Sequence, residues 1–140
     1  MESHQLTSEI INKYKDKSIQ WLVGNAQFYF NKFIRLRDFN KGCISCGGKV
    51  EHAGHYLSAG HHQALRFMES NCSGQCLRCN HFLRGNAINY RINLIKRIGE
   101  VKVTNLEDAA AYYNKVGFKH SRLSLIETIL TYREKCKYFK

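Results

Sequence analysis

The chain has 140 residues, a length typical of one domain. Its 22 Lys and Arg against 11 Asp and Glu give a formal net charge of +11, which indicates a polyanionic partner, most simply nucleic acid. A hydrophobic content of 44% excludes a disordered basic tail, and the absence of any apolar run near ~18 residues excludes a membrane span. Since the N-terminus lacks a signal-peptide pattern, we expect a cytoplasmic protein whose Cys stay reduced.

The first two regions differ in composition. Residues 5–40 place apolar side chains at helical spacing, which predicts a long N-terminal helix that Gly24 breaks or bends. Residues 41–83 hold five of the six Cys and five of the seven His, and they contain too few apolar residues to form a core of their own. This middle region is therefore where we look for a metal site.

The remaining residues are predicted to be helical. A helix is expected over 84–98, with Arg91 in the middle of its apolar face, where it pairs with an internal carboxylate or contacts a phosphate. Thr104 and Glu107 form a capping box that predicts a helix start, and Gly117 fits the end of that helix.

A last helix is expected over 121–138, and it carries an apolar seam. Core packing inside the monomer and a dimer interface are both open for this seam, which consists of Leu125, Ile129, Tyr132, Cys136 and Phe139. The pattern predicts a mainly helical α+β fold with regions 1–40, 41–100 and 101–140 in one compact domain.

Two Cys-x2-Cys pairs give the strongest chemical signal. Cys43 and Cys46 form the first pair, and Cys76 and Cys79 form the second. Each pair can place two thiolates on one side of an ion, and together they supply the closed tetrahedral sulfur site that structural zinc prefers. Cys72 could compete as a ligand, but its spacing to Cys76 suits a knuckle less well.

Histidine and asparagine residues lie between and directly after the pairs. The order along the chain is Cys-x2-Cys, His52, His55, Asn71, Cys-x2-Cys and Asn80. This pattern resembles the HNH endonucleases, the ββα-metal or His-Me finger class, and it implies a zinc-stapled, treble-clef-like core between flanking helices.

Further motifs resemble one family of recombination nucleases from lambda-like phages, the NinG or Rap family. The similarity covers about residues 27–100, in the segments FNKFIRLRD (30–38), CISCG (43–47), AGHY (53–56), LRF (65–67), QC (75–76), CN (79–80), RGN (84–86) and 90–95. It implies structure-specific cleavage of branched DNA, including Holliday junctions and displacement loops.

The resemblance also implies roles for single residues. His55 would be the general base that activates water, Asn71 would brace the loop after the strand, and Asn80 would bind one catalytic Mg²⁺ or Mn²⁺. The family more often has Asp where this chain has His52, so we take His52 as the second metal ligand, with Glu51 as its main rival. An imidazole there favours Mn²⁺, Ni²⁺ or Zn²⁺ over Mg²⁺.

His81 is an alternative to Asn80 as metal ligand, since it follows directly. A backbone carbonyl of the Ala53–Gly54 stretch is the expected partner that orients His55, and a bulge at Gly54 would help to bring His52 to the metal.

DNA contacts are expected from basic side chains around this site, mainly to phosphates. The candidates are Arg35, Arg37, Arg66, Arg84, Arg91, Lys96, Arg97 and Lys102. We expect a homodimer in the bacterial host cell, because two strands must be cut, and recombination proteins as further partners. The alternatives are a non-catalytic zinc-ribbon protein that binds branched DNA and a protein–protein adaptor, which the basic excess disfavours.

Overall fold

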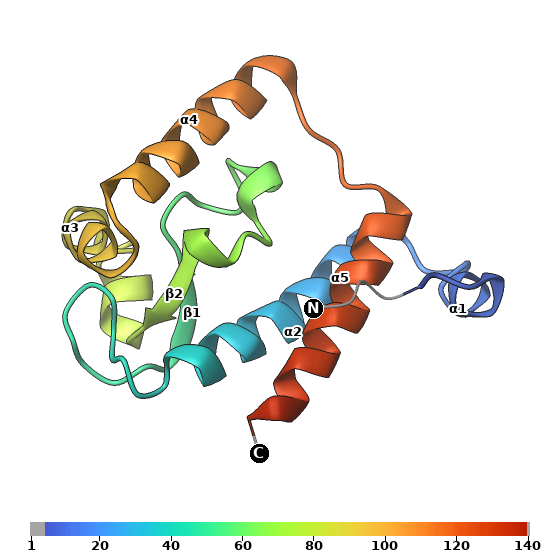
Figure 1. Ribbon diagram of the computed structural model, residues 1–140, viewed down its shortest axis with the longest axis horizontal. Coiled ribbons are helices and arrows are strands. Elements are labelled where there is room, and N and C mark those ends of the chain that lie inside the picture. The colour runs from blue at the N-terminus through green and yellow to red at the C-terminus, as the bar shows by residue number, and fades with distance from the viewer. Residues whose placement is uncertain (1–4, 140) are drawn as a thin grey trace. The chain divides into compact units, whose positions relative to one another are not determined.

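A computed structural model describes residues 5–139 (Figure 1). It contains five α-helices, two short strands and four short helical turns in that range. The helices are α1 (Ser8–Lys13), α2 (Ile19–Asp38), α3 (Ala87–Ile98), α4 (Glu100–Val116) and α5 (Arg122–Lys135), and the strands are β1 (His52–His55) and β2 (Cys72–Gln75). The turns are η1 (Gln63–Leu65), η2 (Glu69–Asn71), η3 (Arg78–Phe82) and η4 (Cys136–Tyr138).

The described chain divides into two compact units. Unit 1 takes in the residues up to Phe33 and those from His120 onward, and unit 2 spans Ile34–Lys119. The predicted arrangement of regions 1–40, 41–100 and 101–140 in one compact domain stays a prediction. The two chain ends share one unit, and α4 belongs with the cysteine-rich middle of the chain.

The N-terminal helical region is interrupted earlier than predicted. The break lies between α1 and α2, where the side chain of Ser18 accepts a hydrogen bond from the Trp21 amide at 3.0 Å and so caps α2. Gly24, the predicted break, lies inside α2, and a methyl group there would meet no neighbouring atom within 4 Å. A single glycine in a helix with favourable neighbours costs too little to end it.

Unit 1 is held together by apolar and aromatic packing. Tyr132 on α5 lies edge-on to Phe30 at a centroid distance of 4.8 Å and contacts Phe33 at 5.3 Å. Ile129 and Leu125, one and two turns earlier, are fully buried. The core-packing interpretation of the α5 seam is therefore confirmed for these positions. The helix ends at Lys135, and residues 136–138 tighten into the turn η4.

Unit 2 is built around the antiparallel pair β1–β2. The register pairs His52 with Gln75, Gly54 with Ser73, and His55 with Cys72. Because the pairing runs through Gly54 without a break, the predicted bulge there is absent from this strand pair. All four residues of β2 are buried.

Positive φ angles set the starts of α3 and α4. Arg84 and Asn86 have φ of 50° and 44°, so α3 begins at Ala87 and not at Arg84. Gly99, with φ of 93°, separates α3 from α4 and places the start of α4 at Glu100. The predicted capping box is thus wrong, because Thr104 lies within the helix. Gly117 ends α4, as predicted.

An apolar cluster joins α3 and α4 to the first cysteine pair. Its buried members are Ile44, Tyr90, Leu94, Val103 and Leu106. Since Val103 and Leu106 come from α4, this packing is the reason that α4 belongs to unit 2. Over residues 5–139, none of the helices combines the length and apolar character that a membrane crossing requires.

Candidate metal centre and active site

The two Cys-x2-Cys pairs converge on one point of unit 2. The sulfur atoms of Cys43, Cys46, Cys76 and Cys79 all lie within 4.8 Å of one another. Cys46 and Cys76 are 3.6 Å apart, close to the roughly 3.8 Å expected between two sulfurs of a tetrahedral zinc site with Zn–S bonds of about 2.3 Å. The cluster can therefore hold a metal ion such as zinc. Cys72 is buried on β2 and lies outside it.

The four thiols differ in how readily they ionise, and burial raises the pKa of Cys79 to about 12. The amides of Gly48 and Cys79 donate to Cys46 and Cys76, each at 3.4 Å. Burial works against ionisation of Cys43, but backbone N–H groups of Cys76, Cys46 and Ser45 lower the pKa of that thiol to about 7. Ionised sulfur is the form that a metal binds.

The metal ligands predicted for catalysis lie side by side. The amide nitrogen Nδ2 of Asn80 is 3.1 Å from Nδ1 of His52, which joins the turn η3 to the start of β1. Gly54, two residues along on the same face of β1, lies beneath Asn80, because a Cβ on Gly54 would come within 3.0 Å of Asn80 Oδ1. His52 and Asn80 are both half-buried, so a bound ion could still be reached by substrate.

The rival ligands face other partners. The carboxylate of Glu51 accepts a hydrogen bond from the Leu77 amide at 2.7 Å, which ties it to the second cysteine knuckle. His81 is exposed and lies edge-on to Phe82 at a centroid distance of 5.0 Å. This geometry favours His52 over Glu51 and Asn80 over His81.

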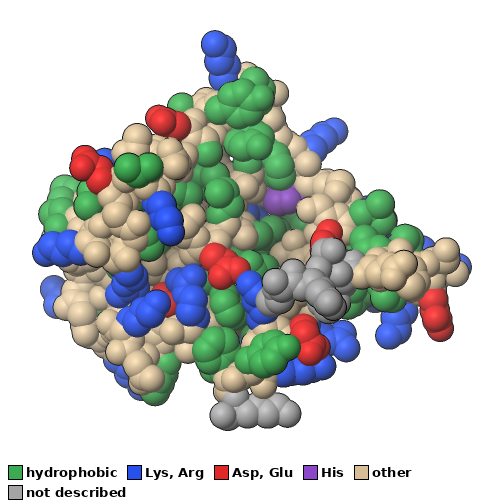
Figure 2. Space-filling view, in the orientation of Figure 1, with side chains coloured by type: hydrophobic (Ala, Val, Ile, Leu, Met, Phe, Trp, Pro, Cys, Tyr) green, Lys and Arg blue, Asp and Glu red, His purple; other side chains and the backbone are tan. Residues whose placement is uncertain are grey.

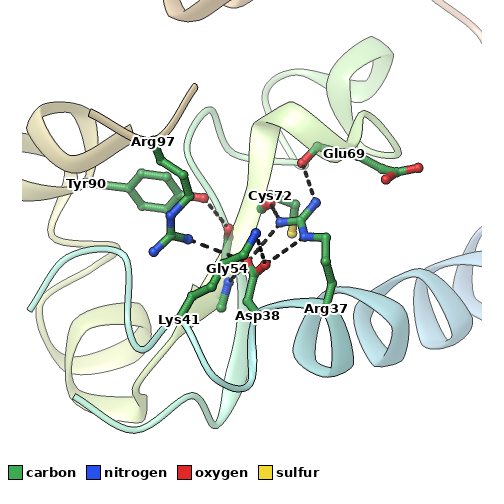
Figure 3. Close-up of polar contacts among 9 residues, drawn as sticks. Arg37, Asp38, Lys41, Gly54, Glu69, Cys72, Tyr90 and Arg97 are labelled. Atoms are coloured by element: carbon green, nitrogen blue, oxygen red, sulfur yellow. Dashed lines mark hydrogen bonds and ion pairs between the residues drawn. The ribbon is translucent and has the colours of Figure 1, made fainter. Parts of the chain in front are cut away.

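His55 is oriented by a carbonyl from the loop between the strands. Its Nε2 lies 2.8 Å from the carbonyl oxygen of Arg66. A carbonyl can only accept, so Nε2 carries the proton and the lone pair of the neutral ring is on Nδ1. The expectation of a carbonyl from Ala53–Gly54 is wrong, because the Gly54 oxygen accepts from the Tyr90 hydroxyl at 2.7 Å instead (Figure 3).

The protonation of His55 follows from its surroundings. Burial lowers the pKa of this histidine, while its hydrogen bond to the Arg66 carbonyl opposes the shift. His55 is therefore neutral at pH 7, which is the form that can take a proton from water.

Asn71 holds the loop that carries the Arg66 carbonyl. Its side-chain Nδ2 donates to the carbonyls of Leu57 and Leu65 at 3.0 and 3.2 Å, and its Oδ1 accepts from the Leu57 amide at 2.9 Å. The side chain is fully buried, so these three bonds fix both ends of the loop. Asn71 thus acts on His55 through the backbone and does not contact it directly.

A buried carboxylate that the sequence analysis missed connects α2 to β2. Asp38 receives two hydrogen bonds from Arg37, at 2.7 and 2.9 Å, and one from the Gly74 amide at 2.8 Å (Figure 3). Lys41 and Arg97 approach the same carboxylate to 3.6 and 3.8 Å. Arg37 also donates to the carbonyls of Glu69 and Cys72. Arg37, predicted to bind DNA, is therefore occupied with internal partners.

The other predicted DNA-binding residues fall into two groups. Arg91 pairs with Glu107 at 3.0 Å, which is the internal carboxylate that the sequence left open, and Arg66 donates to Gln63 at 3.0 Å. Arg35 is half-buried, whereas Arg84, Lys96 and Lys102 are exposed. Figure 2 shows Lys and Arg side chains protruding over several elements, with Asp and Glu side chains among some of them.

Two further residues of the site were missed, Gln75 and Tyr90. Gln75 is fully buried at the end of β2, and its Nε2 donates to Ser45 and to the Gly85 carbonyl. A signal was present in the sequence, because Gln75 directly precedes the second cysteine pair and Tyr90 lies in a segment that resembles the family. Neither Gln nor Tyr by itself indicates a buried polar role.

Comparison with known proteins gives a consistent result. Over residues 2–140 the chain matches the family model described as "Bacteriophage Lambda NinG protein". It is 40% identical over 100 residues to Protein ninG of Escherichia phage lambda, covering 69% of this chain and 49% of the relative. Protein ninG of Salmonella phage P22 gives the same values, and that of Enterobacteria phage H19B is 39% identical with 69% and 50% covered.

The chain therefore spans about half the length of the curated relatives it matches. No solved structure matches it significantly.

Proposed function

The chain belongs to the NinG family, and from this premise we propose that it is a metal-dependent endonuclease of the HNH, or His-Me finger, class that cleaves branched DNA. One observation carries the proposal. His52 at the start of β1 lies next to Asn80 on the turn η3, which also carries Cys79 of the four-cysteine cluster. The neutral His55 lies at the other end of β1, and the Arg66 carbonyl orients its ring.

The residues at the pair fit a divalent cation. Amide oxygens and imidazoles are both ligands of divalent metals, so Asn80 and His52 could together hold such an ion, and the missing side chain at Gly54 lets the Gln75 amide lie next to Asn80. A bound Mg²⁺ or Mn²⁺ would neutralise charge on the scissile phosphate and stabilise the departing 3′ oxygen. A structural zinc on the four cysteines would hold the strands and the turn in register.

His55 would act as the general base. With Nε2 donating to the Arg66 carbonyl, Nδ1 would take the proton from the attacking water, and the carbonyl would stabilise the imidazolium that forms. Asn71 would maintain this geometry, because its three hydrogen bonds hold the loop between Leu57 and Leu65.

Substrate binding would depend on phosphate contacts. The exposed Arg84, Lys96 and Lys102 are the best candidates, because their side chains are not committed to buried partners. Cutting two strands symmetrically requires two active sites, so we propose a homodimer acting on junctions in the bacterial host cell, alongside other recombination proteins.

A synthetic four-way junction tests the proposal. Wild type should nick it in Mn²⁺, and to a lesser degree in Mg²⁺, and a linear duplex of the same sequence should be cut far less. His55→Ala and Asn80→Ala should each lower the nicking rate by roughly 10²–10⁴-fold. His61→Ala, a change of an exposed histidine that hydrogen-bonds Ser58, should leave the rate unchanged.

The same junction experiment distinguishes a nuclease from a protein that only binds branched DNA. The resemblance gives one reason for the non-catalytic candidate, since it implies that His52 stands where the family more often has an acidic ligand. A wild-type protein that binds the junction but never nicks it in either metal would establish that candidate. Normal nicking by His55→Ala would show that another group is the base.

A further inference from the structure

A buried amide oxygen beside Asn80 lacks a hydrogen-bond partner. Gln75 is fully buried, and its Nε2 donates to Ser45 Oγ at 2.8 Å and to the Gly85 carbonyl at 2.9 Å. Because the Gly85 carbonyl can only accept, these bonds fix which end of the amide is nitrogen. Within residues 5–139, the oxygen at the other end, Oε1, is buried without a partner. Such a group costs about 1–3 kcal/mol unless something binds it.

This oxygen points at the same place as the side chain of Asn80. A Cβ built on Gly54 would collide with Gln75 Oε1 and would come within 3.0 Å of Asn80 Oδ1. Two carbonyl-type oxygens therefore lie over the same glycine, and Gln75 Oε1 takes the place that a side chain of residue 54 would occupy. Two acceptors cannot bond each other, so this arrangement calls for a cation or a donor between them.

We propose that Gln75 Oε1 is an oxygen ligand of a divalent cation, together with Asn80 Oδ1. This inference rests on the proposed function, because it adds a ligand to the metal site of the nuclease. Hard divalent cations bind amide oxygens, and a neutral ligand can be buried without the cost of burying a second carboxylate. The same geometry explains why residue 54 is glycine, since a Cβ there would collide with the Gln75 amide and displace Oε1.

Ser45 and Gly85 give Gln75 its fixed orientation. Ser45 is buried between the cysteines of the first pair, and the Gly85 carbonyl follows the turn η3 that carries Asn80. The cysteine cluster and the cation site therefore share one polar connection through the Gln75 amide. A ligand held at its far end loses little freedom on binding an ion.

Binding of Mn²⁺ to the zinc-loaded protein tests the inference without measuring cleavage. The free-Mn²⁺ signal in electron paramagnetic resonance gives the affinity of wild type, Gln75→Met and Gln27→Met. Gln75→Met keeps the length of the side chain and removes the oxygen, so it should weaken Mn²⁺ binding by roughly 10–100-fold. Gln27→Met makes the same change on α2 in unit 1, where Gln27 donates to Asn31, so its Mn²⁺ affinity should stay near that of wild type.

Gly54→Ala provides a second route if Gln75→Met loses its zinc. The added methyl group removes no ligand atom but collides with Gln75 Oε1 and pushes that oxygen out of its position, so Mn²⁺ affinity should fall while the zinc content stays at one per chain. The inference would be overturned if Gln75→Met or Gly54→Ala, with its zinc retained, bound Mn²⁺ as tightly as wild type. It would mean that Asn80 turns its amide nitrogen toward Gln75 and satisfies Oε1 directly.

Failure of the inference and of the proposed function are distinguishable. If wild type binds Mn²⁺ more tightly than Gln75→Met but nicks no junction, the ligand assignment stands and the nuclease proposal fails. If wild type nicks the junction and Gln75→Met binds Mn²⁺ equally well, the nuclease proposal stands and the ligand assignment fails.

Discussion

The two units of this chain are stabilised by different kinds of interaction. In unit 1 the contacts that join α2 and α5 are aromatic and aliphatic, such as Tyr132 against Phe30. In unit 2 the strands are short and the buried polar side chains gather around them. Every fully or nearly buried polar residue in the described part of the chain belongs to unit 2, namely Asp38, Ser45, Asn71, Ser73 and Gln75.

This difference bears on the proposed active site. Apolar packing tolerates adjustments in position, whereas each buried polar group accepts few partners and so specifies one geometry. The buried hydrogen bonds of unit 2 therefore hold His52, His55 and Asn80 in defined positions, and its fold would depend on these bonds and on a metal held by the four cysteines. Changing one unit and observing both tests this contrast.

Loss of the cysteine-bound metal should have the largest effect. Cys76→Ser removes one of four ligands, so we expect the region 43–86 to lose amide protection from hydrogen exchange, because metal binding and folding are linked. Amides of α5 in unit 1 should keep their protection. Cys136→Ser, which changes a thiol that donates to the Tyr29 carbonyl in unit 1, is the matched control and should leave 43–86 protected. Unchanged protection of 43–86 in Cys76→Ser would show that the strands do not need the metal.

Removal of the Asp38 charge should have the second-largest effect. Asp38→Asn leaves the half-buried Arg37 without its fully buried anion, which should destabilise unit 2 by about 3 kcal/mol. The change should appear as faster transfer of zinc to a colorimetric chelator in urea. Lys41→Ala is the control, because Lys41 is exposed and its loss leaves Arg37 and Gly74 in place.

Asp38 also determines how the stability of unit 2 changes in acid. Although burial opposes ionisation, the hydrogen bonds and charge of Arg37 lower the pKa of this carboxyl below its ordinary value. A lowered folded-state pKa contributes stability that is present above about pH 4 and is lost as pH falls through the folded-state value. The difference in zinc release between wild type and Asp38→Asn should therefore shrink below pH 4. A difference that grows in acid would contradict this sign.

A cavity in unit 1 should leave unit 2 unaffected. Ile129→Ala empties a fully buried position on α5 and should cost about 3 kcal/mol. Trp21 is the sole tryptophan and lies on α2 in unit 1, so its fluorescence reports unfolding of that unit. Zinc release and Mn²⁺ affinity should stay at wild-type values. A parallel loss of zinc would show that the two units fold as one.

Removal of one hydroxyl should have a smaller effect within unit 2. Tyr90→Phe leaves the buried Gly54 carbonyl without its 2.7 Å donor, which should cost about 2 kcal/mol and loosen β1 beside the proposed cation site. Tyr56→Phe removes a hydroxyl that donates to Glu107, a partly exposed carboxylate, and should cost less. Equal losses in urea titrations of the two variants would contradict the special role of Tyr90.

How much of this could be predicted from the sequence depended on the kind of interaction. The cysteine spacing predicted the four-thiol cluster, and the apolar period of 121–138 predicted α5, because both signals are local. The motifs predicted the family. The helix starts at 84 and 104 were wrong, because they depend on positive φ at Asn86 and Gly99, which composition alone does not reveal.

Long-range polar partners were the hardest to predict. Nothing in the sequence joins Arg37 to the Cys72 carbonyl or His55 to the Arg66 carbonyl, because these bonds exist only after the chain has folded. The positive charge of Arg37 also led to an unsupported prediction. Arg37 counted toward a DNA surface, yet its partner is the buried Asp38 next to it in the sequence.

The helix cap of α5 gives the smallest effect and limits the contrast between the units. Ser121 Oγ accepts a hydrogen bond from the Ser124 amide at 3.1 Å, so unit 1 has a polar contact too, but an exposed one. Ser121→Ala should lower the free energy of unfolding of unit 1 by about 1 kcal/mol, measured by Trp21 fluorescence in urea titrations. The loss is small because water partly replaces the lost hydrogen bond. Ser124→Ala, which keeps the amide and favours helix, should leave stability unchanged or slightly raised. If Ser121→Ala cost as much as Tyr90→Phe, burial would not be what makes the polar contacts of unit 2 costly to lose.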